Sequence, residues 1–206
     1  MNCLIITPFI SRPLGEIIGK RKFDIVMCAD ASDEIARKAG LCPNVIIGDF
    51  DHGDLPQGDN ITRVPCEKDD TDTMLCIKRA LSLGADDIFI AGGVGGRLDH
   101  TIANIQSIAY AEKNGAHAVL SDGDNEAFLI TKNAKVPRRD GYYFSLFSYG
   151  DECRGVSASG VKYRIRKGTL DFSFPLGVSN EITADYAEIS VESGTLLAIF
   201  SKKEQK

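Results

Sequence analysis

The sequence predicts an α/β protein with an N-terminal three-layer α/β domain, built on a mainly parallel sheet, and a C-terminal antiparallel β-sandwich or barrel. Two observations lead to this prediction. Up to about residue 130, short apolar runs alternate with segments of helical spacing. Beyond that point, short β-branched and aromatic runs are separated by glycine, serine and asparagine. Alternation of strand and helix is typical of parallel sheets, whereas many short strands are typical of sandwiches and barrels.

Five apolar runs predict the strands of the N-terminal sheet. They are continuous rather than alternating, as expected for parallel strands that helices cover on both faces. The five runs are residues 4–6, 25–29, 45–47, 88–91 and 118–120.

Two segments between these runs have the spacing of amphipathic helices. Residues 70–83 carry apolar side chains on one face, with Asp69 and Asp70 as expected N-cap residues and Gly84 as the stop. Residues 101–114 repeat isoleucine at helical spacing and also end before a glycine. These two helices complete the expected alternation.

The C-terminal half is expected to contain strands and no helix. The expected strands are residues 142–149, 161–165, 170–174, 186–191 and 195–200, with residues 192–194 as a hairpin turn. The polar, basic stretch near residue 131 suggests the boundary between two domains. We therefore expect an N-terminal domain of residues 1–130 and a C-terminal domain of residues 131–206.

Composition excludes several classes of protein. The chain has 206 residues, 43% of them hydrophobic and 26% charged, an ordinary globular balance. Its net charge of −5 argues against nucleic acid as the main partner, because phosphate backbones attract basic surfaces. Six cysteines without a C-x-x-C pair favour free thiols over disulfides or a zinc site. Without a signal-peptide pattern or an apolar stretch of about 20 residues, we expect a cytoplasmic protein that does not enter the membrane.

Aspartates collect where the predicted strands end. Asp30 follows the second strand, Asp49 and Asp51 follow the third, and Asp72 lies at the start of a helix. Ligands of open α/β sheets bind beyond the carboxyl ends of the strands. Mg²⁺ prefers carboxylate oxygens together with water and substrate phosphates. We therefore expect Asp49, Asp51 and Asp72 to bind Mg²⁺, while the competing interpretation is that these aspartates cap turns and helices.

A second candidate site is the glycine-rich segment GGVGGRLDH at residues 92–100, between a predicted strand and a predicted helix. Glycines let a backbone approach a ligand closely and turn its N–H groups toward an anion. Arg97 can donate two hydrogen bonds to phosphate oxygens. His100 is either a general base or a hydrogen-bonding residue at the start of the helix, and the sequence alone favours the structural role.

These segments resemble the ordered signatures of the thiamine pyrophosphokinase family. The resemblance rests on the segments PNVIIGDFD at residues 43–51, KDDTDT at 68–73 and GGVGGRLDHTIAN at 92–104, with GVSNE at 177–181. It implies an enzyme that transfers the diphosphate of ATP to thiamine, giving thiamine diphosphate and AMP, with Mg²⁺ required. It also implies a homodimer with active sites at the interface, a nucleotide-binding α/β half and a thiamine-binding β half.

The resemblance assigns expected roles residue by residue. Catalysis would involve Asp49, Asp51, Asp72, Arg97, Asp99 and His100. ATP would contact Asp30, Gly93, Gly95, Gly96 and Arg97. Thiamine would contact Ser179 and Asn180, with an aromatic residue such as Tyr163 or Phe172 stacking on it. The sequence departs from the family where Ala31 and Ser32 replace two glycines after Asp30, which puts the close approach of that turn to the nucleotide in doubt.

Three rival functions are compatible with parts of the pattern. One is a diphosphokinase acting on another alcohol, such as a pterin, and residues 177–181 argue against it. Another is a phosphohydrolase in which Asp49 is a nucleophile, which expects its aspartate pair at the first strand rather than the third. The last is a non-catalytic thiamine or nucleotide sensor, which the altered turn after Asp30 permits.

Overall fold

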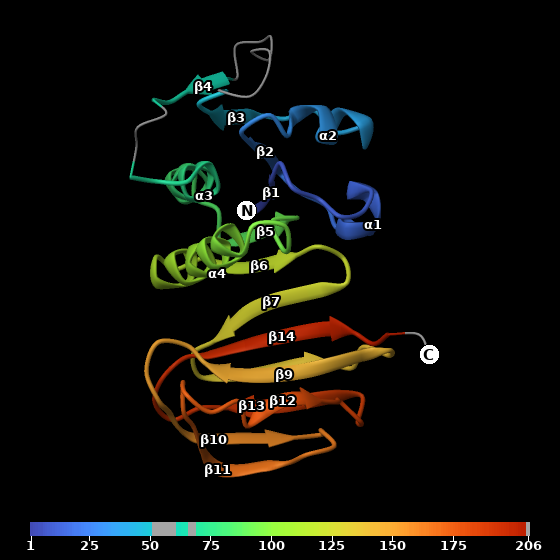
Figure 1. The fold of residues 1–206 in the computed structure, drawn as a ribbon, viewed down its shortest axis with the longest axis vertical. Helices are drawn as coiled ribbons and strands as arrows, with labels where there is room; N and C mark the ends of the chain where they lie inside the picture. The colour runs from blue at the N-terminus through green and yellow to red at the C-terminus, as the bar shows by residue number, and fades with distance from the viewer. Residues whose placement is uncertain (51–60, 66–68, 205–206) are drawn as a thin grey trace. The chain divides into compact units, whose positions relative to one another are not determined.

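The computed structural model describes residues 1–50, 61–65 and 69–204. Within these residues the chain forms two compact units, Met1–Gly123 and Asp124–Lys206. The expected fold class is confirmed, because the first unit is built on a parallel sheet and the second on antiparallel strands. Figure 1 shows both units as a ribbon.

The first unit contains six parallel strands in the order β6-β5-β1-β2-β3-β4. The bounds are β1 Asn2–Ile6, β2 Ile25–Ala29, β3 Val45–Gly48, β4 Ile61–Arg63, β5 Asp87–Ala91 and β6 His117–Ser121. Four strands are buried over most of their length, because helices cover the sheet. The sequence did not predict β4, because this strand has only three residues and two of them, Thr62 and Arg63, are polar and exposed.

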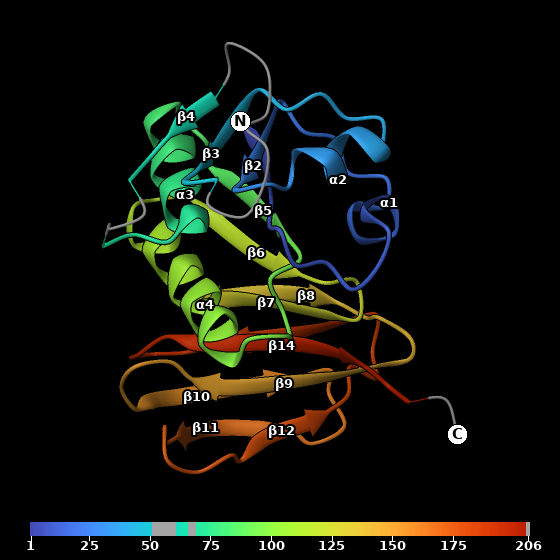
Figure 2. The ribbon, with the colours of Figure 1, turned by 45° about the horizontal axis from the view of Figure 1, so that its top comes forward.

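Helices lie on both faces of this sheet, as Figure 1 and Figure 2 show. Their bounds are α1 Leu14–Ile18, α2 Asp33–Lys38, α3 Asp72–Ser82 and α4 Leu98–Lys113. The two long helices match the predicted segments. The expected N-cap at Asp69 or Asp70 is wrong, because Thr71 caps α3 and its hydroxyl accepts the N–H of Met74 at 3.2 Å. Asp70 instead forms an ion pair with Lys78, with its Oδ2 atom 2.6 Å from the Lys78 Nζ atom.

The second unit packs two antiparallel sheets around one core. One sheet has the order β12-β9-β14-β7 and the other β11-β10-β13-β8. The bounds are β7 Asn125–Ile130, β8 Asn133–Pro137, β9 Tyr142–Ser148, β10 Cys153–Ser159, β11 Ile165–Leu170, β12 Gly177–Asn180, β13 Tyr186–Ser190 and β14 Leu196–Lys202. Phe144 and Phe200 meet in the core with ring centroids 5.0 Å apart.

Two details of the predicted β half are wrong. Residues 192–194 do not form a hairpin turn, because β13 pairs with β8 and β10 while β14 pairs with β7 and β9 in the other sheet. Residues 161–165 and 170–174 are mostly outside strands. The strands in this part of the chain are instead β10, which precedes both segments, and β11, which lies between them. Apolar alternation identifies a strand face but not its partner, so such errors of pairing are expected.

Within the described residues, no helix has the length and apolarity needed to cross a lipid bilayer.

One ion pair at the amino-terminal edge of the parallel sheet makes stability depend on pH. His117 Nδ1 lies 2.6 Å from Glu112 Oε1, and this hydrogen bond raises the pKa of His117 above its usual 6.5. A raised pKa in the folded state stabilises the protein below the unfolded-state pKa, and the contribution is lost as pH rises through the folded-state value.

We expect His117→Gln to lower the melting temperature more at pH 6 than at pH 9, measured by circular dichroism. An equal loss at both pH values would contradict this.

Candidate active site

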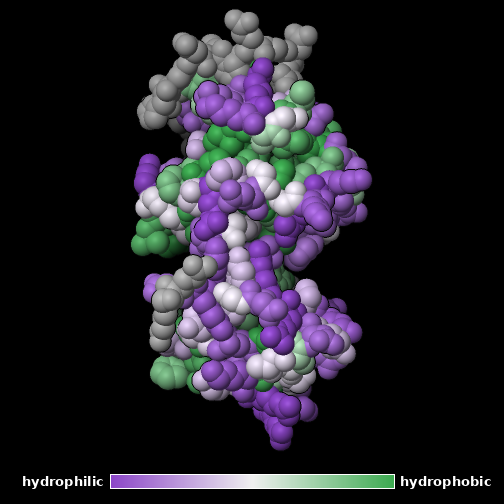
Figure 3. Space-filling view, turned by 90° about the vertical axis from the view of Figure 1, so that its right-hand side faces the viewer, coloured by the Kyte–Doolittle hydropathy of each residue, from purple (hydrophilic) through white to green (hydrophobic). Residues whose placement is uncertain are grey.

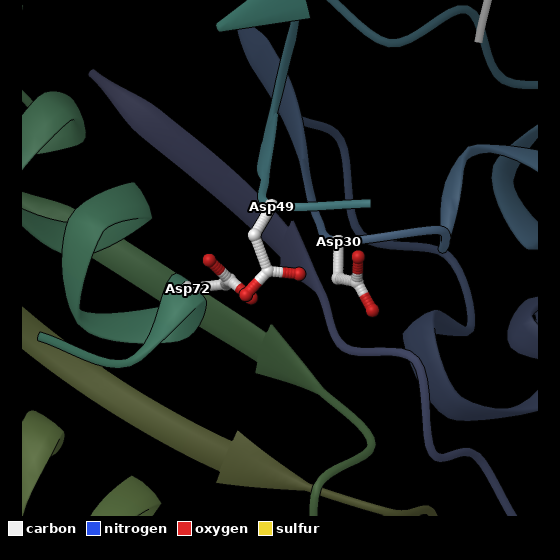
Figure 4. A group of neighbouring side chains, drawn as sticks. All are labelled: Asp30, Asp49 and Asp72. Carbon is white, nitrogen blue, oxygen red and sulfur yellow. The ribbon is translucent and has the colours of Figure 1, made fainter. Parts of the chain in front are cut away.

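Three aspartates from separate segments meet at the carboxyl edge of the parallel sheet. Asp30 follows β2, Asp49 follows β3 and Asp72 begins α3. One carboxylate oxygen from each lies within 4.8 Å of those from the other two, and all three residues are half-buried. Figure 4 shows the Asp49 and Asp72 carboxylates turned toward one another, with Asp30 beside Asp49.

This spacing fits a divalent cation. Two oxygens bound to one Mg²⁺ are at most about 4.2 Å apart, because each Mg–O distance is about 2.1 Å. Small movements of the side chains would therefore bring all three oxygens onto one ion. Three carboxylates at such a distance also repel each other, and a cation would relieve this repulsion. The donor set, oxygen atoms only, is the one that Mg²⁺ prefers.

Backbone contacts bring Asp30 to this site. The Asp30 N–H donates to the Ile47 carbonyl at 2.7 Å, and Asp30 has a left-handed conformation with φ of 50°. Asparagine and aspartate tolerate this conformation better than most residues. At Gly48, an added Cβ atom would lie only 2.7 Å from the Asp30 Cα atom. The absence of a side chain at Gly48 therefore allows the end of β3 to lie against Asp30.

The sequence analysis predicted only part of this group of aspartates. Asp49 and Asp72, two of the three expected metal ligands, come together, and Asp30 joins them rather than lying outside the group. Asp51 lies outside the described residues. Phe50, which follows Asp49, is buried and has φ of 54°, so the backbone is not extended at this residue.

The turn after Asp30 is held by the residue that replaces a glycine. Ser32 is fully buried and its hydroxyl donates to the Ile6 carbonyl at 2.8 Å. This hydrogen bond connects the start of α2, just after β2, to the end of β1. It therefore holds the carboxyl ends of β1 and β2 together. The serine thus supplies a tether that a glycine could not.

The glycine-rich loop between β5 and α4 uses much of its backbone internally. Gly92 donates its N–H to the Ser121 carbonyl and Gly93 to the Phe9 carbonyl, both at 2.8 Å, while Gly95 donates to the Thr101 hydroxyl at 3.1 Å. These three N–H groups are therefore not directed at an anion, contrary to the expectation for the whole loop. The glycines serve close packing instead, since an added Cβ at Gly93 would lie 2.3 Å from the Asn104 amide nitrogen.

Arg97, Asp99 and His100 lie together at the start of α4. Arg97 donates from Nε and Nη2 to the Asp99 carboxylate at 3.1 and 2.6 Å. This pairing lowers the pKa of Asp99. Asp99 also accepts the His100 N–H at 2.9 Å. The Arg97 guanidinium is exposed, and Asp99 accepts hydrogen bonds from its Nε and Nη2 atoms.

A cavity of about 170 Å³ joins the loop to α3. Arg97, His100 and two of the loop glycines line it, together with residues that the sequence analysis missed, namely Thr7, Pro8, Phe9, Thr73 and Asn104. Asn104 is buried and donates to the Gly93 carbonyl at 2.9 Å. Asn104 lies within residues 92–104, which resemble a signature of the family. This resemblance is the one sequence signal that could have identified Asn104. Phe9 follows a predicted strand with no pattern to mark it.

The second unit places Ser179 and Asn180 at the end of β12. The Asn180 side chain is buried and bonds Tyr163 twice, accepting its N–H at 2.9 Å and donating to its carbonyl at 2.7 Å. Ser179 is exposed, has φ of 58°, and donates its N–H to the Ser145 hydroxyl at 3.0 Å. Asn180 therefore fixes the backbone that presents the exposed Tyr163 ring, and Phe172 is exposed as well.

A parallel α/β sheet with carboxylates gathered at its carboxyl edge, next to a glycine-rich loop and an exposed arginine, is typical of enzymes that bind phosphate groups through a metal ion. Sequence comparison assigns the family. The thiamin pyrophosphokinase catalytic domain matches residues 20–120, and the vitamin B1 binding domain of the same family matches residues 131–196. The chain belongs to the thiamin pyrophosphokinase family.

Relatives and solved structures agree with this assignment. The chain is 27% identical to thiamine pyrophosphokinase of Bacillus subtilis over an alignment of 172 residues, which covers 79% of this chain and 80% of that protein. It is 26% identical to thiamine pyrophosphokinase 2 of Oryza sativa, over 84% of this chain and 70% of that protein. The crystal structure of the Bacillus subtilis protein has the same fold, with a TM-score of 0.88 at 21% identity over the whole of both chains.

Gly48 provides a direct test of how the aspartates are brought together. We expect Gly48→Ala to weaken Mn²⁺ binding about 10-fold, because the added methyl group separates Asp30 from Asp49. Isothermal titration measures this affinity. Gly15→Ala is the matched control, since an added Cβ there meets no atom within 4 Å. Equal Mn²⁺ affinity in both variants would show that the contact at Gly48 does not position the site.

Proposed function

We propose that this protein transfers the diphosphate of ATP to the hydroxyl of thiamine, giving thiamine diphosphate and AMP in a Mg²⁺-dependent reaction. The observation that carries the proposal is the convergence of Asp30, Asp49 and Asp72 in a chain that belongs to the thiamin pyrophosphokinase family. The rival functions of another alcohol substrate or a non-catalytic sensor have no comparable support.

The carboxylates would hold and orient the nucleotide through its metal. Asp49 and Asp72 face one another across the site, and Asp30 closes one side, with Asp51 proposed as a further ligand. A bound Mg²⁺ would neutralise phosphate charge and fix the geometry of the reacting phosphoryl group. Transfer of this kind depends mostly on positioning and charge stabilisation, so the residues need not form covalent bonds.

Arg97 is proposed to stabilise the charge on the phosphates. Asp99 occupies two of its donor groups and fixes the plane of the guanidinium, which leaves the Nη1 edge to donate to phosphate oxygens. His100 lines the cavity beside this arginine and is proposed to complete the site. Gly93, Gly95 and Gly96 would give the nucleotide close access to the loop, because no side chain projects from them.

The second unit is proposed to bind thiamine. Ser179 is exposed on β12, and Asn180 holds the loop that carries the Tyr163 ring. Ser179 would contact thiamine directly, whereas the two hydrogen bonds of Asn180 favour an indirect role. In this proposal residues 1–130 bind nucleotide and metal, and residues 131–206 bind thiamine. We also propose a cytoplasmic homodimer with active sites at the interface.

The reaction itself is tested by separating the nucleotide products after incubation with ATP, Mg²⁺ and thiamine. We expect AMP and thiamine diphosphate in equal amounts, with AMP formation dependent on thiamine. Formation of ADP would indicate transfer of a single phosphate, and free phosphate without thiamine diphosphate would indicate a hydrolase. Either product, or the absence of turnover, contradicts the proposed reaction.

Asp49 is the ligand whose loss should affect catalysis most. We expect Asp49→Asn to lower kcat by about 100-fold or more, because it weakens the charge stabilisation that the metal supplies. Asp24→Asn is the matched control, since Asp24 lies before β2 at the opposite edge of the sheet and accepts the Asn2 N–H. Steady-state kinetics compare the two variants. A kcat for Asp49→Asn within twofold of the control would remove Asp49 from the catalytic site.

A further inference from the structure

A groove of about 630 Å³ lies on the outer face of the sheet β11-β10-β13-β8, within the second unit. Residues of all four strands line it, including Lys135, Arg166, Lys167 and Glu188. It involves neither the aspartates of the proposed active site nor Ser179 and Asn180. Figure 3 shows hydrophilic residues over much of the surface of this unit that is visible in that view.

The groove is basic although the protein is acidic. Four cationic residues, Lys135, Arg164, Arg166 and Lys167, line the groove with one acidic residue, Glu188, whereas the whole chain carries −5. Two of them have contacts of their own, since Lys167 Nζ lies 3.7 Å from Glu192 Oε1 and Lys135 Nζ lies 3.5 Å from the Tyr186 ring centroid. Among the residues that the structure describes, Arg164 and Arg166 form no ion pair. Both are exposed and available to a ligand.

An irregularity in β11 concentrates this charge. Consecutive side chains of a regular strand point to opposite faces, yet Arg166 and Lys167 of β11 are both exposed, whereas Ile165 packs against the core. The register of β10 against β11 shifts on each side of Val156, and Lys167 has φ of 45°. The Ser157 hydroxyl accepts the Lys167 N–H at 3.2 Å and holds this conformation. Bulges of this kind redirect side chains and are frequent next to binding sites.

The floor of the groove supplies hydroxyl groups. Ser157 lies opposite Ser190 in the register of β10 and β13, and Ser159 lies opposite Glu188. The alternate residues Val156 and Ala158 point into the core, so these serines face outward. Small hydroxyl side chains leave room for a ligand and can donate to its oxygens.

We propose that this groove binds a small anion that carries two or more linked phosphate groups. Arginine guanidinium groups match phosphate oxygens with paired hydrogen bonds, and the serines add neutral donors. The volume is within the range of small-molecule sites. A long nucleic acid is disfavoured by the net charge of −5, and the carboxylate of Glu188 adds a like charge among the groove residues. The inference is independent of the function proposed for the first unit.

Inorganic triphosphate is the probe that tests this site. The protein is titrated without divalent cations and with EDTA, so that metal-dependent binding at the aspartates is suppressed, and ¹H–¹⁵N NMR spectra report the site. We expect saturable shifts at the amides of Ser157, Ser159, Lys167 and Ser190. In a parallel arm with ATP, the same amides should shift, since the phosphate chain is the part recognised.

Variants connect the binding to the groove. The double variant Arg164→Gln/Arg166→Gln is expected to weaken triphosphate binding at least 10-fold, because it removes two charge-assisted contacts. The matched control is Arg138→Gln/Arg154→Gln, which removes the same charge from arginines of this unit that pair with Asp140 and Glu152. Glu188→Gln is expected to tighten binding about fivefold by removing a like charge.

Several results would overturn the proposal. They are linear shifts without saturation, saturable shifts confined to residues outside the groove, equal weakening by the two double variants, or unchanged binding in Glu188→Gln. Thermal melts of all variants establish that they are folded, and Glu188→Gln keeps the test decisive because its expected effect is a gain of affinity.

Discussion

The close approach of three carboxylates at one sheet edge is the constraint on which the site depends. Asp30, Asp49 and Asp72 come from two strand ends and a helix start, and each would repel the others in the absence of a cation. Their positions are fixed by the fold rather than by their own side chains. Gly48 lets the end of β3 lie against Asp30, and the Thr71 cap fixes where α3 begins. The sheet and the helix cap thus hold three negatively charged carboxylates close together, and a metal ion would stabilise this arrangement.

Much of the first unit could be predicted because its signals are local. Continuous apolar runs mark the buried parallel strands, and the 3.6-residue spacing marks α3 and α4. The short helices α1 and α2 have only five and six residues, too few for a helical period to be recognised. Asp49 and Asp72 could be assigned from their places after a strand and at a helix start. Asp30 was expected near them as an ATP contact, but its distance from the other two carboxylates could not be predicted, since it depends on a contact between segments that are separate in sequence.

The second unit shows a different limit of sequence reasoning. Its strands are short and their number is roughly apparent, but their partners are not, so β13 and β14 were expected to form a hairpin and instead belong to different sheets. The segment around Ser179 and Asn180 was recognised only by family resemblance. The structure adds that the Asn180 amide is committed to the backbone of Tyr163, which explains physically why an asparagine fits this position.

Anomalous diffraction from crystals soaked with Mn²⁺ and a non-hydrolysable ATP analogue tests the central claim most directly. The account predicts one Mn²⁺ peak at about 2 Å from carboxylate oxygens of Asp49 and Asp72, with Asp30 in contact with the ion or with its bound water, and phosphate oxygens completing the shell. A peak that lies away from these aspartates, or nucleotide bound with the three carboxylates turned apart, would contradict it.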